Sequence, residues 1–290
     1  MQGGFAMHIG VIGGLNLDIL GTPHAPLSLR DSNPGTVTLR AGGVGHNIGA
    51  QLGRMGYKVT MLTALGSDPQ SGVLMDLCKK DGIDLSYALH THCPTCTYLC
   101  LHDEGGDMYC AINDMQAVDQ LTPEHIAPLL HALENASLCV MDCNLPESTL
   151  LYCARTLNMP LFVDPVSAFK ADKSIDALPY LTAIKPNLME AQSMTGQKDP
   201  ADCAKWLLDK GVKNVFVSLG EQGVYYASHS DRGRMPALPL PENLPLTGAG
   251  DSLCAGLIEG LLRGLDAKEC AALGCQTAHD TLILLNQPTL

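Results

Sequence analysis

From residue 122 onward, helical and strand patterns alternate along the chain, and this alternation is the feature that most restricts the possible folds. Strands separated by helices pair in parallel, because each helical crossover returns the chain to the same end of the sheet. The sequence therefore predicts an α/β fold: a three-layer sandwich with a mainly parallel central sheet flanked by helices. The predicted helices are 122–134, 146–157, 187–195 and 200–210, and the predicted strands are 138–142, 161–164, 181–184 and 214–218.

Polar residues follow these strands at their carboxyl ends, where ligands bind in open parallel sheets. We therefore expect the active-site rim along this edge. The groups that meet there are Asp142-Cys143-Asn144, Asp164-Pro165, Lys185-Pro186-Asn187 and Ser218-Leu219-Gly220.

The N-terminal part repeats this arrangement. A short apolar strand, 8–12, leads into Gly13-Gly14-Leu15-Asn16-Leu17-Asp18. Asn16 and Asp18 are candidates for binding sugar hydroxyls, and the alternative is a pair of Asx turns.

A glycine-rich helix start follows at Gly42-Gly43-Val44-Gly45-His46-Asn47. It is not a dinucleotide fingerprint, because Ile48 stands where that motif requires glycine. A hairpin at 95–112 then interrupts the alternation. Together with 36–40 it predicts a small lid outside the main sheet, with Asn113 and Asp114 at its exit facing the substrate.

A second glycine-rich helix start, Thr247-Gly248-Ala249-Gly250-Asp251, carries the strongest chemical signal. The first N–H groups of a helix lack intrahelical partners and can hold an anion. A carboxylate at the same turn can accept a proton from a hydroxyl, so the pair suggests phosphoryl transfer. The alternative is a glycine-rich loop with an Asp cap.

Asn187 and Glu190 have the spacing either to hold a hydrated Mg²⁺ beside phosphates or to cap the helix that follows. Taken without its context, the segment Gly220-Glu221-Gln222-Gly223 predicts only a turn. No Gly-x-x-x-x-Gly-Lys occurs, which argues against a P-loop nucleotide site.

Composition limits the classes of partner. The 290 residues include 18 Lys+Arg against 30 Asp+Glu, a net charge of −12 that disfavours nucleic-acid polymers and anionic membrane surfaces. With no secretion signal, no apolar run of membrane-spanning length and 12 scattered cysteines, we expect a cytoplasmic protein that acts on a small molecule. Cys93-Pro-Thr-Cys96 has metal-site spacing but lacks a second half-site, so ordinary packing residues are the favoured interpretation.

Gly42-Gly43 with Asn47, Asn187-x-x-Glu190 and Thr247 to Asp251, in this order, resemble the PfkB (ribokinase-like) carbohydrate kinase family over nearly the whole chain. The resemblance implies a single kinase domain over 1–290, with lid strands inserted at about 31–41 and 95–114. It also implies ATP and Mg²⁺ as cofactors.

Several further segments resemble the pseudouridine kinase branch of this family, which implies phosphorylation of a nucleoside on its 5′-hydroxyl. A kinase for another nucleoside or a free sugar, and a non-catalytic nucleoside-binding protein, remain as alternatives. The segments are Asp31 to Gly35, Gly42 to Ile48, Ala111 to Met115, Asp142 to Asn144 and Asp164 to Ala168.

The resemblance also assigns roles to single residues. It makes Asp251 the general base and the Gly248, Ala249 and Gly250 turn the anion hole. The substrate-binding residues are Asn16, Asp18, Gly42, Gly43, Asn47, Asn113, Asp114 and Asn144. The nucleotide-binding residues are Asn187, Glu190, Ser218, Gly220, Gly223 and Thr247, with Glu190 holding Mg²⁺ through water.

Two positions depart from the family pattern. His46 stands where this branch has Arg, which replaces a guanidinium by a titratable imidazole. Leu244-Pro245-Leu246 lacks the acidic residue that many relatives place beside a monovalent cation, so K⁺ dependence stays open. The exposed lid strands leave a homodimer as a further expectation.

Overall fold

The computed structural model describes residues 7–241 and 244–286, and its main body is built on one large sheet. The strands of this sheet are β1 (His8–Ile12), β4 (Lys58–Leu62), β6 (Ile83–Asp84), β10 (Leu138–Asp142), β11 (Leu161–Asp164), β12 (Ala183–Ile184), β13 (Asn214–Ser218), β14 (Val224–Ser228) and β15 (Arg232–Met235).

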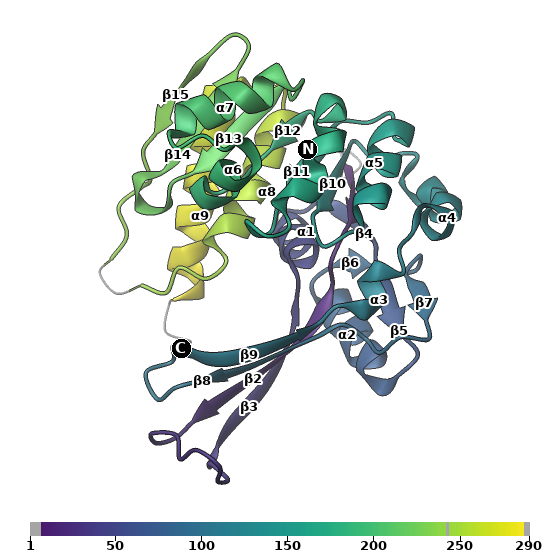
Figure 1. Cartoon of the computed structure of the whole chain (residues 1–290), viewed down its shortest axis with the longest axis vertical. Coiled ribbons are helices and arrows are strands. Elements are labelled where there is room, and N and C mark those ends of the chain that lie inside the picture. Colours follow the sequence, from purple (N-terminus) through teal and green to yellow (C-terminus); the bar gives the residue numbers. More distant parts are fainter. Residues whose placement is uncertain (1–6, 242–243, 287–290) are drawn as a thin grey trace, which may run out of the picture.

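The nine strands are ordered β15-β14-β13-β12-β11-β10-β1-β4-β6 (Figure 1). Every pair from β6 to β13 is parallel, and only β14 and β15 pair antiparallel, at one edge. The predicted mainly parallel sheet is therefore confirmed.

Helices cover both faces of this sheet because successive strand residues point to opposite sides. In β10, Val140 packs into one hydrophobic core and Met141 into the other. The Val140 face is covered by α1 (Val44–Arg54), α2 (Pro69–Lys80), α8 (Ala249–Leu262) and α9 (Ala267–Leu285). The Met141 face is covered by α3 (Gln116–Asp119), α4 (Pro123–Ile126), η1 (Ala127–Leu133), α5 (Glu147–Thr156), η2 (Ala171–Tyr180), α6 (Leu188–Thr195) and α7 (Pro200–Asp209).

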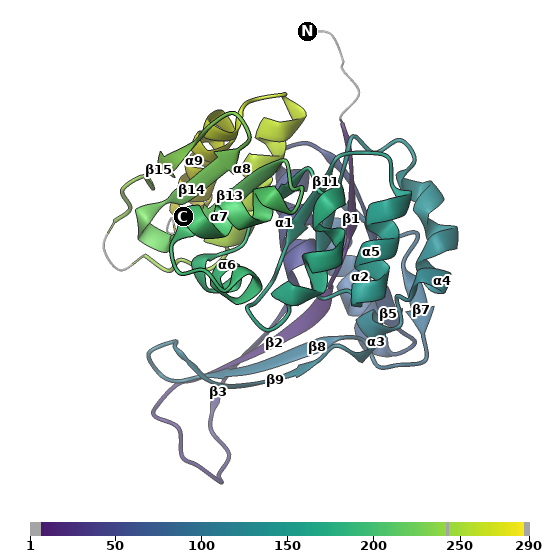
Figure 2. The same ribbon diagram turned by 45° about the horizontal axis from the view of Figure 1, so that its top comes forward.

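A second sheet projects from the main body, as the two views in Figures 1 and 2 show. It consists of β2 (Asn16–Pro23), β3 (Gly35–Gly42), β8 (Thr97–His102) and β9 (Met108–Asp114), in the order β3-β2-β8-β9. A short pair, β5 (Ala64–Gly66) and β7 (Leu89–Thr91), lies apart from both sheets.

The structure corrects three sequence-based boundaries. Residues 16–23 form strand β2 rather than a polar turn, because buried Leu17 pairs in register with Ala41 and Thr97 on either side. The predicted helix 122–134 splits into α4 and η1, since Pro128 offers no backbone N–H. Helix α8 begins at Ala249, so Asp251 lies inside its first turn.

Two expectations concern the chain as a whole. Within the described residues, no helix combines the length and the apolar character needed to cross a membrane. All 12 cysteines are free thiols, and most are buried.

Candidate active site

Asp251 links the two glycine-rich helix starts. Gly248, at φ 86°, adopts the left-handed conformation that glycine tolerates and turns the chain sharply into α8. The Asp251 carboxylate then accepts a 3.0 Å hydrogen bond through Oδ2 from Nδ2 of Asn47 on α1. Side chains 204 positions apart therefore meet at one point.

The backbone N–H groups at the start of α8 belong to the same turn as this carboxylate. The N–H of Ala249 donates to the carbonyl of Leu246 at 3.1 Å, whereas the N–H groups of Gly250 and Asp251 have no acceptor within the described part of the chain. Both groups lie at the positive end of α8, where an anion is stabilised. The turn can therefore hold a negatively charged oxygen beside a carboxylate.

The environment of Asp251 increases its proton affinity. Burial, followed by the negative charge of Asp164, raises its pKa to about 6, although Lys185 and the hydrogen bond from Asn47 act in the opposite direction. A carboxylate with this pKa is ionised at neutral pH and still accepts a proton more readily than an exposed Asp.

A buried ion pair lies close to the same turn. Nζ of Lys185 is 2.8 Å from Oδ2 of Asp164, and a Cβ atom at Gly250 would lie 3.8 Å from that Nζ. Burial is the largest single effect and lowers the pKa of Lys185, but the neighbouring acidic groups, led by Asp164, together raise it above its ordinary value, so the ammonium stays charged. A fixed positive charge therefore faces the proposed anion site.

Asp142 organises the backbone at this edge. Its carboxylate is fully buried and accepts N–H groups from Gly14 at 2.9 Å, from Gly45 at 2.7 Å and from Asn144 at 2.8 Å. It thereby ties the start of α1 to the ends of β1 and β10. The Asn144 side chain accepts a 2.6 Å hydrogen bond from Nζ of Lys170, so part of its hydrogen-bonding capacity is already used.

Asp18 lies in a row of side chains across the projecting sheet. The register pairs Arg40 with Asp18, Asp18 with Tyr98, and Tyr98 with Asn113, so the four residues share one face. Burial is the main cause that raises the pKa of Asp18, and a hydrogen bond from Asn16 opposes it.

Strand β3, which carries part of this row, leads directly into the start of α1. A Cβ at Gly42 would collide with the Asp18 carboxylate, and Gly43 has φ 100°. These contacts bring Asn16, Asp18, Gly42, Gly43 and Asn47 into one region.

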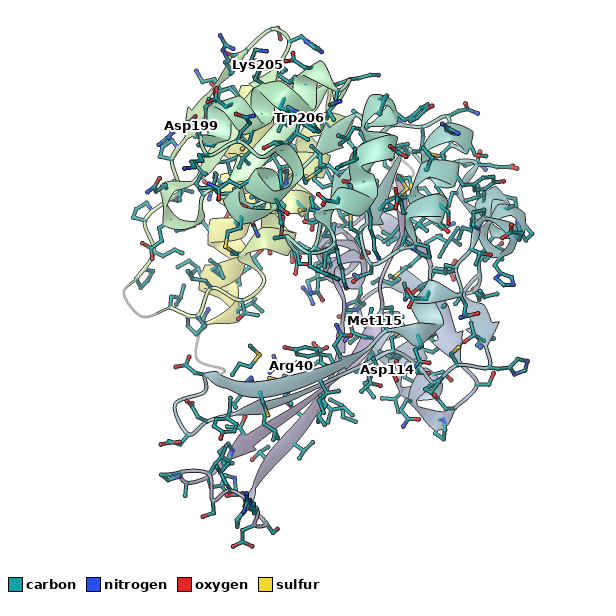
Figure 3. All side chains as sticks on the ribbon, in the orientation of Figure 1. Arg40, Asp114, Met115, Asp199, Lys205 and Trp206 are labelled. Atoms are coloured by element: carbon teal, nitrogen blue, oxygen red, sulfur yellow. The ribbon has the colours of Figure 1, made fainter. Side chains whose placement is uncertain are left out.

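Asn113 and Asp114 do not share a face, because successive strand residues alternate. Asn113 is on the Asp18 side, and Asp114 points the other way and accepts a 3.2 Å hydrogen bond from the N–H of Gln116. Figure 3 labels Asp114 near the junction of β9 with the main body and Arg40 on the projecting sheet.

Asn187 and Glu190 form a complete capping box at the start of α6. Asn187 N and Nδ2 each donate to Glu190 at 2.8 Å, and Glu190 N donates to Asn187 Oδ1 at 2.9 Å. Glu190 is only 4% exposed, and burial followed by Asp164 raises its pKa. The capping interpretation is therefore confirmed, and both Glu190 oxygens are engaged, which fits an Mg²⁺ contact through water rather than a direct bond.

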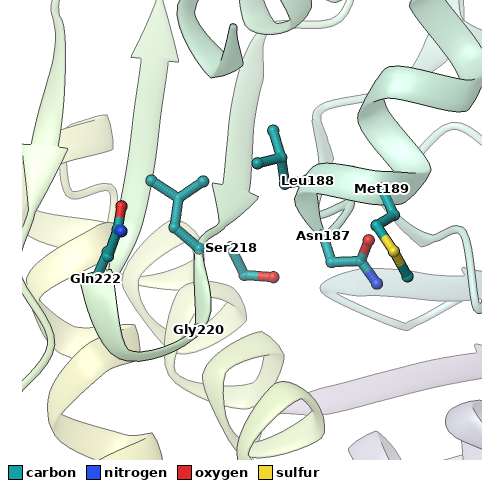
Figure 4. A pocket seen from close by; sticks show the side chains of 7 residues that line it. Asn187, Leu188, Met189, Ser218, Gly220 and Gln222 are labelled. Atoms are coloured by element: carbon teal, nitrogen blue, oxygen red, sulfur yellow. The ribbon is translucent and has the colours of Figure 1, made fainter. Parts of the chain in front are cut away.

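A cavity of about 280 Å³ opens beside this box, between α6 and the turn that includes η3 (Gly220–Gln222) (Figure 4). Ser218 and Gly220 are part of its lining, while Gly223 ends the η3 turn. The lining combines apolar side chains with a few polar groups, as is common in sites for small molecules and cofactors. The lining residues are Asn187, Leu188, Met189, Ser218, Leu219, Gly220 and Gln222.

The metal-site alternative at Cys93 and Cys96 gains no geometric support. Across 7–241 and 244–286, no three His, Cys, Asp or Glu side chains are grouped so as to hold a metal ion. Cys96 is fully buried in a hydrophobic core, and burial raises the pKa of its thiol.

The comparisons with known proteins agree with this geometry. The model of the pfkB family of carbohydrate kinases matches residues 8–281. The chain belongs to this family. It is therefore a phosphotransferase that acts on a hydroxyl group, and pfkB kinases use ATP, typically with Mg²⁺.

Two pfkB relatives from Escherichia coli are more than 30% identical to the chain. A pseudouridine kinase is 34% identical over 98% of this chain and 93% of its own length. An uncharacterised sugar kinase is 31% identical over 97% of this chain and 80% of its own length. Among solved structures, a carbohydrate kinase from Agrobacterium tumefaciens superposes with a TM-score of 0.84 at 25% identity, covering 94% of this chain and 89% of that one.

The sequence analysis placed Lys185 and Asp164 on the rim of the sheet but did not pair them with each other, because that pairing needs three-dimensional contacts. It missed two further polar residues of the candidate site. Arg40 and Tyr98 become candidates only through the register of the projecting sheet.

Proposed function

We propose that this chain transfers the γ-phosphoryl group of ATP to the 5′-hydroxyl of a nucleoside, with pseudouridine as the substrate. The observation that carries the proposal is the Asp251 carboxylate, which is hydrogen-bonded to Asn47 and lies in the first turn of α8, where two N–H groups have no acceptor among the described residues. The Escherichia coli relative with pseudouridine kinase activity supports the choice of substrate.

In this proposal the ribose binds where α1 meets the projecting sheet. Asp18, Asn16 and Asn47 offer acceptors and donors to its hydroxyls, while Gly42 and Gly43 let the backbone approach closely. Asn113, on the same face as Asp18, contacts the base, and the projecting sheet acts as the lid. Asn144 lies at the margin of this site, whereas Asp114, on the opposite face of β9, is left out of it.

ATP lies along the edge formed by the capping box and the η3 turn. Ser218, Gly220 and Gly223 line the nucleotide site, and Thr247 precedes the anion turn. Glu190 would hold Mg²⁺ through water, and the ion would supply positive charge against the phosphates. The Lys185 ammonium and the N–H groups of the turn stabilise charge on the transferred group.

The chemical step is an in-line displacement. Asp251 accepts the proton of the 5′-hydroxyl as its oxygen bonds to the γ-phosphorus, and the bond from that phosphorus to the β,γ-bridging oxygen breaks to release ADP. The products are the 5′-phosphate, ADP and a proton.

A panel of acceptors tests this assignment. ADP release is measured with pseudouridine, uridine, adenosine and ribose at equal concentrations, with Asp251→Asn as the control. We expect the highest kcat/KM with pseudouridine. A strong preference for ribose would instead favour the sugar-kinase alternative, and tight nucleoside binding without ADP release would favour a binding protein.

The outer face of the projecting sheet supports a homodimer as part of the proposal. This face, opposite the Asp18 row, carries exposed apolar side chains that a second copy would cover. The exposed residues on this face are Val37, Leu39, Leu99, Leu101 and Ile112.

A cytoplasmic location and a single functional domain stay predictions from the sequence, and the dependence of activity on K⁺ stays open.

A further inference from the structure

His46 lies directly behind Asn47 and is almost fully buried, with 3% of its surface exposed. Its Nδ1 atom is 3.1 Å from Oδ1 of Asn47, and its Nε2 atom is 3.2 Å from Oδ2 of Asp81. Asn47 in turn donates from Nδ2 to Asp251 at 3.0 Å. Four side chains therefore form a continuous hydrogen-bonded chain that ends at the proposed base.

Both atoms that face the imidazole are oxygen acceptors. A neutral imidazole has one N–H and one lone pair, so either tautomer would direct a lone pair at an oxygen. Only the doubly protonated ring donates in both directions. The pKa of the Asp81 carboxyl is lowered, first of all by the hydrogen bond with His46, so an ionised acceptor faces Nε2.

The orientation of the Asn47 amide depends on this donor. When His46 donates to Oδ1, the NH₂ group faces Asp251 and stabilises its ionised form. Without that donor the amide can rotate by 180° and direct Oδ1 toward Asp251, an arrangement that favours the protonated carboxyl. The donor at Nδ1 of His46 therefore influences the proton affinity of Asp251, although the two side chains are not in contact.

We infer that His46 is a positioning residue, which fixes the Asn47 amide through Nδ1–H and thereby keeps Asp251 ionised and ready to accept the substrate proton. The inference rests on the proposed function for its catalytic meaning, but the effect on Asp251 exists without any substrate.

Other charged groups surround both ends of this chain. Around His46 these are Asp81, Arg54, which lies 3.4 Å from the second Asp81 oxygen, and Asp18 on β2. Around Asp251 they are Asp164, Lys185 and Asp142. The test must therefore change the donor without changing any of these charges.

Two variants of equal charge test the two nitrogen atoms of the imidazole one at a time. In His46→Asn the side-chain NH₂ takes the place of Nδ1 and still reaches Asn47, whereas in His46→Gln the NH₂ takes the place of Nε2 and reaches Asp81 instead. Both variants carry a neutral amide, so a difference between them reports the hydrogen bond to Asn47 and not a difference in charge. Asp76→Asn, which removes an exposed carboxylate on α2, is the control for a remote charge change.

The primary readout is the ¹³C resonance of the Asp251 carboxyl, titrated in the substrate-free protein and assigned by its loss in Asp251→Asn. We expect the Asp251 pKa in His46→Gln to lie about 0.5–1 unit above that in His46→Asn, because the ionised carboxylate loses an oriented donor. Asp76→Asn should match the wild type. Equal pKa values in His46→Asn and His46→Gln would overturn the inference.

Kinetics provide the second readout. The acid limb of kcat/KM should move to higher pH in His46→Gln relative to His46→Asn, with a roughly 2- to 5-fold lower kcat/KM near pH 6. Coincident pH profiles of the two variants would also overturn the inference. A wild-type protein without turnover would count against the proposed function alone, since the carboxyl titration still decides the role of His46.

Discussion

Lys185 and Asp164 form an ion pair of 2.8 Å in which both side chains are almost completely buried, next to the turn that carries Asp251. Burial of two opposite charges is costly, and the pair is stable only while both members are present. The same pair also influences the proton affinity of Asp251: the Asp164 charge raises the pKa of Asp251, and the Lys185 charge lowers it. The stability and the chemistry of this site therefore depend on the same two side chains.

Replacing Lys185 by Met should lower the free energy of unfolding by about 3–5 kcal/mol, because Asp164 is left as an uncompensated buried charge. Chemical denaturation measures this loss. Lys205→Met is the matched control, since Lys205 pairs with Asp209 on the surface at 2.6 Å and such pairs contribute less than about 1 kcal/mol. Equal losses in the two variants would contradict the proposed importance of the buried pair.

The pH dependence of kcat/KM should show an acid limb with a midpoint near pH 6. Asp251 must be ionised to accept the 5′ proton, and its pKa is raised to about 6 by burial and by Asp164. Initial rates between pH 4.5 and 8.5 at low nucleoside concentration measure this limb. A flat profile down to pH 4.5 would exclude Asp251 as a base with this pKa.

Asp251→Asn should stabilise the fold at neutral pH. Because the folded pKa of Asp251 lies above the unfolded value, its contribution to stability is full below about pH 4 and is lost as the pH rises through about 6. The stability of the variant relative to wild type should therefore increase by about 1–3 kcal/mol between pH 4 and pH 7.5. Denaturation curves at the two pH values check this, and a constant difference would be inconsistent with the raised pKa.

Tyr98→Ala should weaken nucleoside binding while leaving ATP binding unchanged. Tyr98 lies between Asp18 and Asn113 in the register of the projecting sheet, whereas the cavity proposed for the nucleotide is lined by residues of α6 and the η3 turn. We expect KM for the nucleoside to rise about 10-fold, since loss of one aromatic contact costs about 1–3 kcal/mol, and KM for ATP to stay within about two-fold. A change in KM for ATP alone would place Tyr98 outside the substrate site. Leu99→Ala, on the opposite face of β8, is the control.

Much of this fold could be predicted from the sequence, because its signals are local. The alternation after residue 122 predicted the parallel sheet, and the glycines before Asn47 and Asp251 predicted two helix starts. Strand β2 was missed because Asn16 and Asp18 are turn-forming residues, and only pairing with β3 and β8 makes them a strand.

The candidate site was predictable to a smaller extent. The Asn187–Glu190 capping box is a local motif and was found by spacing. The contacts of Lys185 with Asp164, and of His46 with Asp81, join segments that are distant in sequence, so no local pattern predicted them. Asn113 and Asp114 were expected at the exit of the hairpin, but β9 extends to Asp114, so these adjacent residues point to opposite faces of the projecting sheet.

The turnover of Asp251→Asn with pseudouridine and ATP is the measurement that tests the central claim most directly. The variant keeps the size of the side chain and removes its ability to accept a proton, so we expect kcat to fall by roughly two to four orders of magnitude. The Kd for the nucleoside, measured by calorimetry, should stay within about three-fold of wild type. A kcat close to that of the wild type would contradict the assignment of Asp251 as the base.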